Sequence, residues 1–121
     1  MPKSTKKYWL KEPENDDFSS ATNYLELIYP LAKAKQLTEK LKAGKITFKK
    51  AKDILRAGEL PLLPESNIHV KENIKKFKTG KLLSPVLLVR GDLKLIIADG
   101  YHRVCAIYYL SEDLEVPCKL V

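Results

Sequence analysis

The stretch DGYHR, residues 99–103, combines side chains that seldom occur together in so short a segment of a small protein. It follows the β-rich apolar residues 96–98 and leads into the apolar run 104–110, so we expect a strand, a turn and a helix. The start of such a helix leaves backbone N–H groups unpaired and carries the positive end of the helix dipole. Both features favour an anion, and the stretch therefore predicts a phosphate-binding turn.

Each side chain of this turn suits such a site. Gly100 allows a positive φ or a close approach of the backbone, and Arg103 offers paired donors to phosphate oxygens. His102 can donate to an oxyanion or transfer a proton near neutral pH. Asp99 would repel a phosphate if unpaired, so we expect it to cap the helix, accept from a substrate hydroxyl or help hold a divalent ion. Asp99 and His102 are the candidate catalytic residues, and Tyr101 could stack on a nucleotide base or lean on the sheet.

The same residues also allow a purely structural interpretation. Asp99 would then be only an N-cap, and Gly100 a turn residue. His102 would be a partly buried ring, and Arg103 a surface charge paired with Asp99. Any one of these residues alone favours the structural interpretation, whereas the four together after an apolar strand favour the anion site.

The elements around the turn are the clearest in the sequence. Gly91 and Asp92 separate two β-rich runs, which predicts a hairpin, and Gly80 ends the helix that precedes it. In chain order we expect a helix from Ser66 or Asn67 to about Thr79, strands over 85–89 and 94–98, a helix over 101–110 and a closing strand over 116–121.

The first half of the chain is expected to be mostly helical. Residues 1–17 lack an apolar period and are expected to form an arm, which Tyr8, Trp9 and Leu10 could fasten to the core. A helix is expected from Ser19 or Ser20 until Pro30 interrupts it, and a second helix ends at Gly44. The residues expected on their apolar faces are Tyr24, Leu27, Ile28, Leu31, Ala34, Leu37 and Leu41.

Residues 45–58 suit either a helix or a short strand. We favour a strand followed by a tight turn at 53–56. The two prolines in the segment that follows, residues 59–66, predict a connecting loop.

Composition restricts the class of protein. With 121 residues the chain is expected to be one domain, and 45% hydrophobic and 31% charged residues are ordinary globular values. The net charge of +7 invites a nucleic-acid partner, but only three of 22 basic residues are arginine, and most lysines are expected on solvated helix faces. No apolar run approaches the roughly 20 residues of a membrane span, and the first 17 residues resemble no secretory signal, so a cytoplasmic protein is expected.

The cysteines and histidines are few. Cys105 and Cys118 lack the spacing of a metal site, and we expect them to be buried and reduced. His69 and His102 lie far apart in the sequence, so no structural metal is expected.

The stretches GKLLSPVLLV, LIIADGYHRVCAIYYL and VPCKLV, in this order after a helix, resemble the ParB/sulfiredoxin-like superfamily. In that superfamily a strand enters a glycine-containing turn followed by His-Arg or Arg-Arg. The resemblance covers residues 46–121 and implies an α+β core with a small mixed β-sheet flanked by helices. A helical hairpin over 18–45 would precede it within a single domain, 1–121. The resemblance also implies that Ser84 lies near the pocket of the turn.

The sequence departs from the patterns of several members of the superfamily, and these departures make some of their activities unexpected. Sulfiredoxins carry a nucleophilic cysteine directly before His-Arg, where this sequence has Tyr101. The nearest thiol, Cys105, lies inside the expected helix, so no sulfiredoxin activity is expected. Partition proteins of the ParB type bind CTP through an arginine-rich turn and read DNA with a downstream module. This sequence stops at Val121 after the closing strand, so a role in partition is not expected. A nuclease is a minor alternative because no carboxylate cluster suits two metals. The D-G-H-H-R motif of small-molecule kinases, including free-serine kinases, resembles ADGYHR most.

The resemblance therefore implies a nucleotide- or phosphate-binding protein, with ATP, ADP or CTP and magnesium as expected ligands. A small-molecule kinase or a nucleotide hydrolase would use the same turn, although Asp53, Glu59 and Glu65 offer no preferred activating carboxylate. One alternative is a non-catalytic module that contacts nucleic acid or an acidic protein through its lysines, and another is an interaction protein whose N-terminal helices recruit a partner. The expected phosphate- or nucleotide-binding residues are Ser84, Asp99, Gly100, Tyr101, His102 and Arg103.

Overall fold

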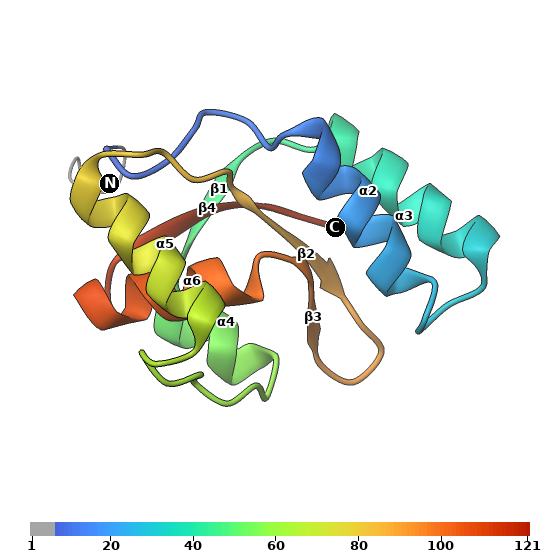
Figure 1. Cartoon of the computed structure of the whole chain (residues 1–121). Helices are drawn as coiled ribbons and strands as arrows, with labels where there is room; N and C mark the ends of the chain where they lie inside the picture. The colour runs from blue at the N-terminus through green and yellow to red at the C-terminus, as the bar shows by residue number, and fades with distance from the viewer. Residues whose placement is uncertain (1–6) are drawn as a thin grey trace.

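A four-stranded mixed sheet forms the centre of the α+β structure, a computed structural model that describes residues 7–121 (Figure 1). The strand order is β1-β4-β2-β3, with β4 parallel to β2 and the other two pairs antiparallel. The elements are α2 (Asn15–Leu25), α3 (Leu31–Ala43), β1 (Thr47–Lys50), α4 (Ala51–Ala57), α5 (Ile68–Thr79), β2 (Val86–Arg90), β3 (Leu95–Asp99), α6 (Tyr101–Leu110) and β4 (Glu115–Leu120).

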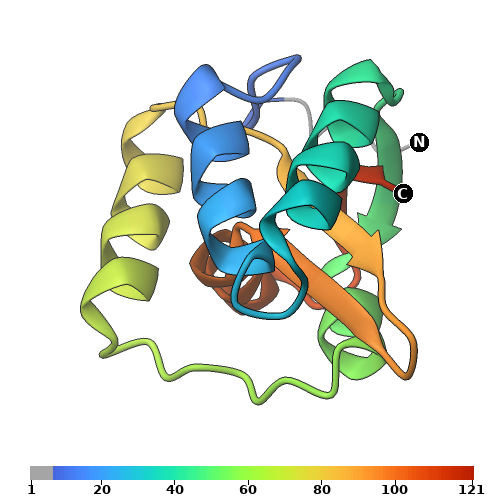
Figure 2. The same ribbon diagram turned by 90° about the vertical axis from the view of Figure 1, so that its right-hand side faces the viewer.

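Helices cover both faces of the sheet. Successive residues of a strand point to opposite faces, and in β2 Val86 and Leu88 join the cluster formed with α4, α5 and α6, whereas Leu87 and Val89 join the cluster formed with α2 and α3. Figure 2 shows α2 and α3 side by side as a hairpin in front of the sheet. The α+β class and the helical hairpin before the core are therefore confirmed.

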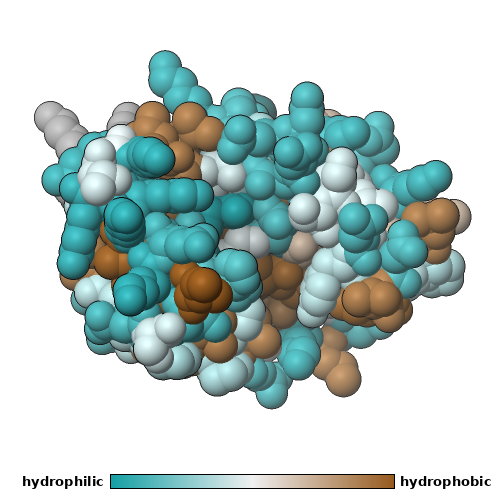
Figure 3. All heavy atoms as spheres, viewed as in Figure 1, coloured by the Kyte–Doolittle hydropathy of each residue, from teal (hydrophilic) through white to brown (hydrophobic). Residues whose placement is uncertain are grey.

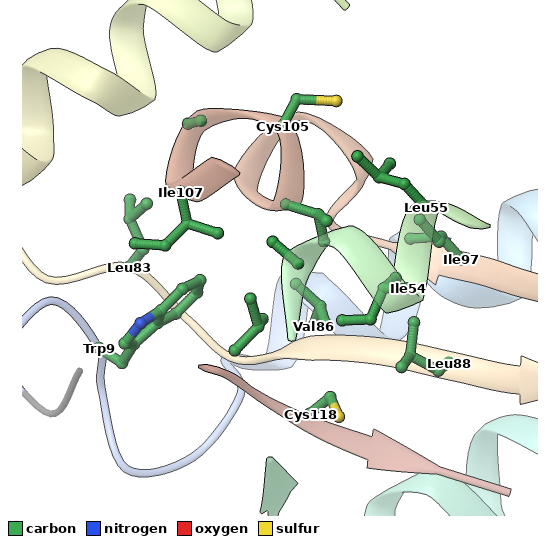
Figure 4. Close-up of a cluster of buried hydrophobic side chains, with 14 of the residues drawn as sticks. Trp9, Ile54, Leu55, Leu83, Val86, Leu88, Ile97, Cys105, Ile107 and Cys118 are labelled. Carbon is green, nitrogen blue, oxygen red and sulfur yellow. The ribbon is translucent and has the colours of Figure 1, made fainter. Parts of the chain in front are cut away.

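The residues that follow the undescribed segment 1–6 fasten the N-terminal arm to the core. The Leu10 N–H donates to the Leu83 carbonyl at 2.8 Å, and the Leu83 N–H donates to the Tyr8 carbonyl at 2.9 Å. The Trp9 ring is buried, with its centroid 5.9 Å from that of Phe77, and lies at the edge of the core cluster in Figure 4. The expected anchoring of the arm is thus confirmed for the part of it that the structure describes.

The first helix differs from its prediction at both ends and in orientation, and it ends at Leu25 rather than just before Pro30. It begins at Asn15 rather than at Ser19 or Ser20, because Glu14 and Asp17 form a capping box in which the Glu14 N–H donates to Asp17 Oδ2 at 2.8 Å. The buried face carries residues 18, 21 and 25, at helical spacing. The expected inward positions of this helix were wrong, since Tyr24, Leu27 and Ile28 are exposed by 46%, 81% and 47%. In the second helix Leu31 is also exposed, by 46%, whereas Ala34 and Leu41 are buried as expected.

The segment after β1 is a helix, not the expected tight turn at 53–56. Ala51, Ile54 and Leu55 lie at i, i+3 and i+4 and are all buried in the core, so α4 gains apolar contacts that a turn would forgo. The remaining elements lie where the sequence predicts them. In α5, the Asn67 side chain accepts from the N–H groups of His69 and Val70, at 3.0 and 3.2 Å, as expected of its cap.

Both cysteines are free and buried, as the sequence predicts, and Figure 4 shows them on opposite sides of the core cluster. Burial raises the pKa of both thiols, that of Cys118 to about 12, so both stay protonated and poorly nucleophilic. None of the helices in residues 7–121 is long and apolar enough to cross a membrane.

Candidate functional site

The turn between β3 and α6 requires glycine at position 100. Gly100 has φ +113°, a conformation that L side chains rarely adopt. A Cβ there would also lie 2.8 Å from Val86 Cβ and 3.0 Å from Arg103 Nη2. The backbone of the turn therefore packs directly on β2, which fixes where α6 begins.

The first turn of α6 presents three backbone donors. Gly100 is the N-cap residue and has no side chain to cap the helix, and the first helical hydrogen bond runs from the Val104 N–H to the Gly100 carbonyl at 3.0 Å. The N–H groups of Tyr101, His102 and Arg103 have no partner within residues 7–121. The prediction that Asp99 caps the helix is therefore wrong. Gly100 occupies the N-cap position, and the Asp99 carboxylate accepts a hydrogen bond from Arg103 instead.

A polar cleft of about 290 Å³ lies between α5 and this turn. The turn contributes Asp99, Gly100, His102 and Arg103, and α5 contributes one polar face at i, i+3, i+4 and i+7 spacing. The residues of that face are His69, Glu72, Asn73 and Lys76.

The cleft brings together the two histidines, which the sequence separates by 33 positions. The ring centroids of His69 and His102 are 4.9 Å apart. Burial lowers the pKa of His102, and the neighbouring charges of His69 and Arg103 lower it further. At neutral pH His102 is therefore a neutral ring that can donate from one nitrogen and accept at the other.

Arg103 lies in a buried ionic cluster rather than at the surface. Its Nη2 donates to Asp99 Oδ2 at 2.8 Å and to the Pro85 carbonyl at 3.4 Å, and lies 3.8 Å from Asp17 Oδ1. The three charged side chains are only 12–17% exposed. The structural pairing of Arg103 with Asp99 is thus present, but it is buried, and it includes a second carboxylate that the sequence did not suggest.

The ionic cluster changes the acidity of Asp99. Burial, and to a smaller extent the neighbouring Asp17, raise the pKa of Asp99 to about 6 against the opposing effect of Arg103. A fraction of Asp99 is therefore protonated just below neutral pH. The Arg103 Nε is buried and has no partner among the described residues.

Two of the predicted site residues face elsewhere. The Tyr101 hydroxyl donates to the Pro61 carbonyl and so holds the loop between α4 and α5, the long segment at the bottom of Figure 2. Ser84 is buried, and it is not among the residues that line the cleft. The structure therefore brings Asp99, Gly100, His102 and Arg103 to the cleft and sets the other two side chains apart from it.

The α5 half of the cleft was not predicted from the sequence. Asp17 and the α5 residues were not predicted as residues of this site, although the polar positions 69, 72, 73 and 76 share one helix face that a helical projection displays. Asp17 gives no such signal, because only the packing of α2 on the sheet brings it to Arg103.

No group of three or more His, Cys, Asp or Glu side chains suited to a metal occurs in the described part of the chain. Neither models of protein families, nor curated proteins, nor solved structures give a significant match to this chain. The function is therefore inferred from the residues of the site.

Proposed function

We propose that the cleft between α5 and the start of α6 binds the phosphate group of a nucleotide or of a phosphorylated small molecule. The observation that carries the proposal is the set of three unpartnered N–H groups, of residues 101–103, at the N-terminus of α6. Such groups, with the positive end of the helix dipole, suit phosphate oxygens. Lys76 lines the same cleft and adds a full positive charge.

Arg103 serves this proposed site by neutralising carboxylates. Asp99 lines the cleft and Asp17 lies beside it, and two unpaired carboxylates would repel a phosphate. The Arg103 guanidinium is in ion-pair distance of both, at 2.8 and 3.8 Å. In this proposal Arg103 is a positioning residue that holds the turn and offsets its acids, and the backbone and Lys76 contact the phosphate.

A divalent cation would enter the cleft with the nucleotide. Mg²⁺ is commonly held by one or two carboxylates together with phosphate oxygens and water. Asp99 and Glu72 are the carboxylates that line the cleft, and the described residues offer no third ligand of this kind. The donor set thus suits a magnesium nucleotide better than a resident metal ion.

The resemblance to the ParB/sulfiredoxin-like superfamily supports ATP, ADP or CTP as the nucleotide and suggests transfer or hydrolysis of a phosphoryl group. Such reactions depend mainly on positioning and on neutralising charge. With Glu72 and the phosphate oxygens holding the cation, Asp99, whose pKa is raised to about 6, is the candidate acceptor for the proton of an attacking hydroxyl, and neutral His102 is the candidate donor to an oxyanion.

Calorimetric titration with inorganic phosphate, and with ATP, ADP and CTP in the presence of magnesium, tests the proposal. Lys75 and Lys76 are adjacent, exposed lysines of α5, and only Lys76 lines the cleft, so the two alanine variants are matched in charge and helix position. Lys76→Ala is expected to weaken binding about fivefold or more, because a charged contact to phosphate is lost, whereas Lys75→Ala should change it by less than about twofold.

Two results would contradict the proposal. One is the absence of heat or stabilisation with any of these ligands at millimolar concentration. The other is salt-dependent binding to DNA or RNA that falls equally in Lys75→Ala and Lys76→Ala, which would indicate the alternative module that uses its lysine-rich surface.

A further inference from the structure

A second hollow lies on the other side of the turn, along the edge of the sheet. It has a volume of about 400 Å³, and six consecutive residues, 94–99, form its floor. Ser20, Tyr24 and Ile28 line one side, and Gly58 and Leu60 line the other. Figure 3 shows hydrophobic atoms at the bottom of a recess in the middle of the face on which β3 lies in Figure 1. We call this hollow the β3 groove.

The floor of the β3 groove is a free strand edge. β3 is the last strand in the order β1-β4-β2-β3 and pairs on one side only. The Gly91 N–H donates to the Lys94 carbonyl at 3.0 Å, so residue 94 directs its backbone toward β2. In an antiparallel pair, successive residues of a strand direct their backbone N–H and C=O groups alternately toward the partner strand and away from it. Leu95 and Ile97 therefore direct these groups to the free edge. Within residues 7–121 these groups have no backbone partner.

The walls of the groove are apolar, and the strand edge lies between them at the bottom of the hollow, where Ile96, Ile97 and Ala98 are 9%, 7% and 4% exposed. Tyr24 and Ile28 are each almost half exposed, although both are large apolar side chains. On the other side Gly58 comes close to the edge: a Cβ on it would lie 3.3 Å from the Leu95 carbonyl oxygen. Because residue 58 has no side chain, the space beside that carbonyl is part of the groove.

These features fit an extended peptide better than other ligands. A strand added to an edge pairs its backbone with the free N–H and C=O groups and places alternate side chains toward each wall. A second copy of the chain would bring its own α2 and α4 walls against these before the two β3 edges could pair. A compact small molecule would leave most of the six-residue floor, about 20 Å long, unpaired.

The charges of the groove favour an acidic residue at one end of the peptide. Among the described lining residues only Lys94 and Asp99 are charged, and Asp99 is already paired with Arg103. Lys94 is exposed and forms no ion pair with any other described residue. The net charge of +7 would also attract an acidic segment.

We infer that the β3 groove binds an extended peptide segment of a partner protein, which adds a strand to β3 and carries alternating apolar side chains with an acidic residue near Lys94. This inference does not depend on the proposed phosphate site, since no phosphate contact enters it.

Selection from a display library of random dodecapeptides on the full chain tests this inference. The enriched peptides are expected to show alternating apolar residues and at least one acid. Binding of a synthesised peptide should protect the amides of Leu95 and Ile97 from hydrogen exchange, because the peptide backbone becomes their partner. A copy of that peptide with N-methyl groups on the alternate residues whose N–H groups face β3 should lose binding about tenfold or more, because the donors to the Leu95 and Ile97 carbonyls are removed.

A matched pair of variants measures the contribution of the apolar wall of the β3 groove to peptide binding. Ile28 lines the groove, whereas its neighbour Leu27 is more exposed and does not. Ile28→Gln is expected to weaken the selected peptide about fivefold, because an apolar contact is lost, and Leu27→Gln should leave its affinity within about twofold.

The inference is overturned if no alternating apolar peptide is enriched, if the N-methylated peptide binds equally well, or if the Leu95 and Ile97 amides stay unprotected. It is also overturned if the chain sediments as a dimer that Ile28→Gln dissociates, since a second copy would then fill the groove. Peptide binding without any nucleotide binding would refute the proposed function and leave this inference intact.

Discussion

Two hollows flank one turn, and they differ in almost every property. The cleft toward α5 is lined by charged and polar groups, including two histidines and a lysine. The β3 groove is lined by a strand edge and by apolar side chains such as Tyr24 and Ile28. Both include Asp99, Gly100 and His102 among their lining residues.

The difference follows from the geometry of the first turn of a helix. Successive residues of an α-helix point about 100° apart, so neighbouring side chains of α6 serve different surroundings. Tyr101 reaches the loop after α4 and bonds to Pro61, whereas Arg103 reaches back to Asp99 and across to α2. One short motif therefore organises two surfaces, and substitutions within it separate those surfaces.

Gly100→Ala is expected to damage both hollows and to have the largest effect. The variant would combine a strained positive φ with a clash against Val86, and we expect a loss of roughly 3–4 kcal/mol in the free energy of unfolding. Chemical denaturation measures this loss. Gly80→Ala is the control, since Gly80 also has a positive φ, +81°, but nothing lies within 4 Å of its added Cβ, so about 1 kcal/mol is expected. Equal losses in the two variants would show that packing on β2 does not fix the turn.

The sequence predicted this turn well because its signals are local. The glycine, the apolar strand before it and the apolar run after it set α6 at Tyr101–Leu110, as the structure has it. The Asp99–Arg103 pair, which belonged to the structural interpretation of the turn, also needs only i, i+4 spacing.

The sequence predicted the surroundings of the turn less well because their signals are tertiary. Tyr24 and Ile28 were expected in the core, yet the capping box at Glu14 starts α2 earlier and the helix buries Phe18, Ala21 and Leu25 instead. Tyr24, on the outer side of α2, and Ile28, three residues after the end of α2, are left to line the β3 groove. The meeting of His69 with His102 likewise depends on how α5 docks on α6, which no short-range pattern encodes.

Asp99→Asn is expected to act on the cleft and to change how stability depends on pH. Because the pKa of Asp99 is raised to about 6, the folded chain binds a proton between about pH 4 and 6 that the unfolded chain does not bind. The contribution of this group to stability is therefore greatest at low pH and is lost as the pH rises through 6. The free energy of unfolding of the wild type exceeds that of Asp99→Asn by an amount that depends on pH. This difference should fall by on the order of 2 kcal/mol from pH 4 to pH 7.

Denaturation of both proteins at several pH values measures this difference. His102 titrates in the opposite sense, since its pKa is lowered, but it is present in both proteins and largely cancels. Asp16→Asn is the control because Asp16 is an exposed acid next to Asp17 in α2. If Asp16→Asn and Asp99→Asn give the same pH profile, the shift is a general charge effect and the buried cluster does not set the acidity of the cleft.

Tyr101→Phe is expected to act on the groove side and to have the smallest effect. It removes the hydroxyl that donates to the Pro61 carbonyl and should lower the free energy of unfolding by about 1 kcal/mol. The loop would become more mobile, so its amides over residues 59–66 should exchange faster while those of α5 and β2 keep their protection. Because Leu60 lies in this loop and lines the groove, a groove-binding peptide should also bind about threefold more weakly.

Tyr108→Phe is the matched control, because Tyr108 is a neighbouring tyrosine of α6 whose hydroxyl makes no hydrogen bond within the described residues. It should change neither loop exchange nor peptide affinity. If Tyr101→Phe instead perturbs the His102 ring resonances while loop exchange stays constant, the side chain of residue 101 belongs to the polar cleft, and the division of the turn between two surfaces is wrong. Faster exchange confined to the loop would assign the side chain of Tyr101 to the groove and leave the backbone N–H of residue 101 to the cleft, so that one residue contributes to each surface through a different group.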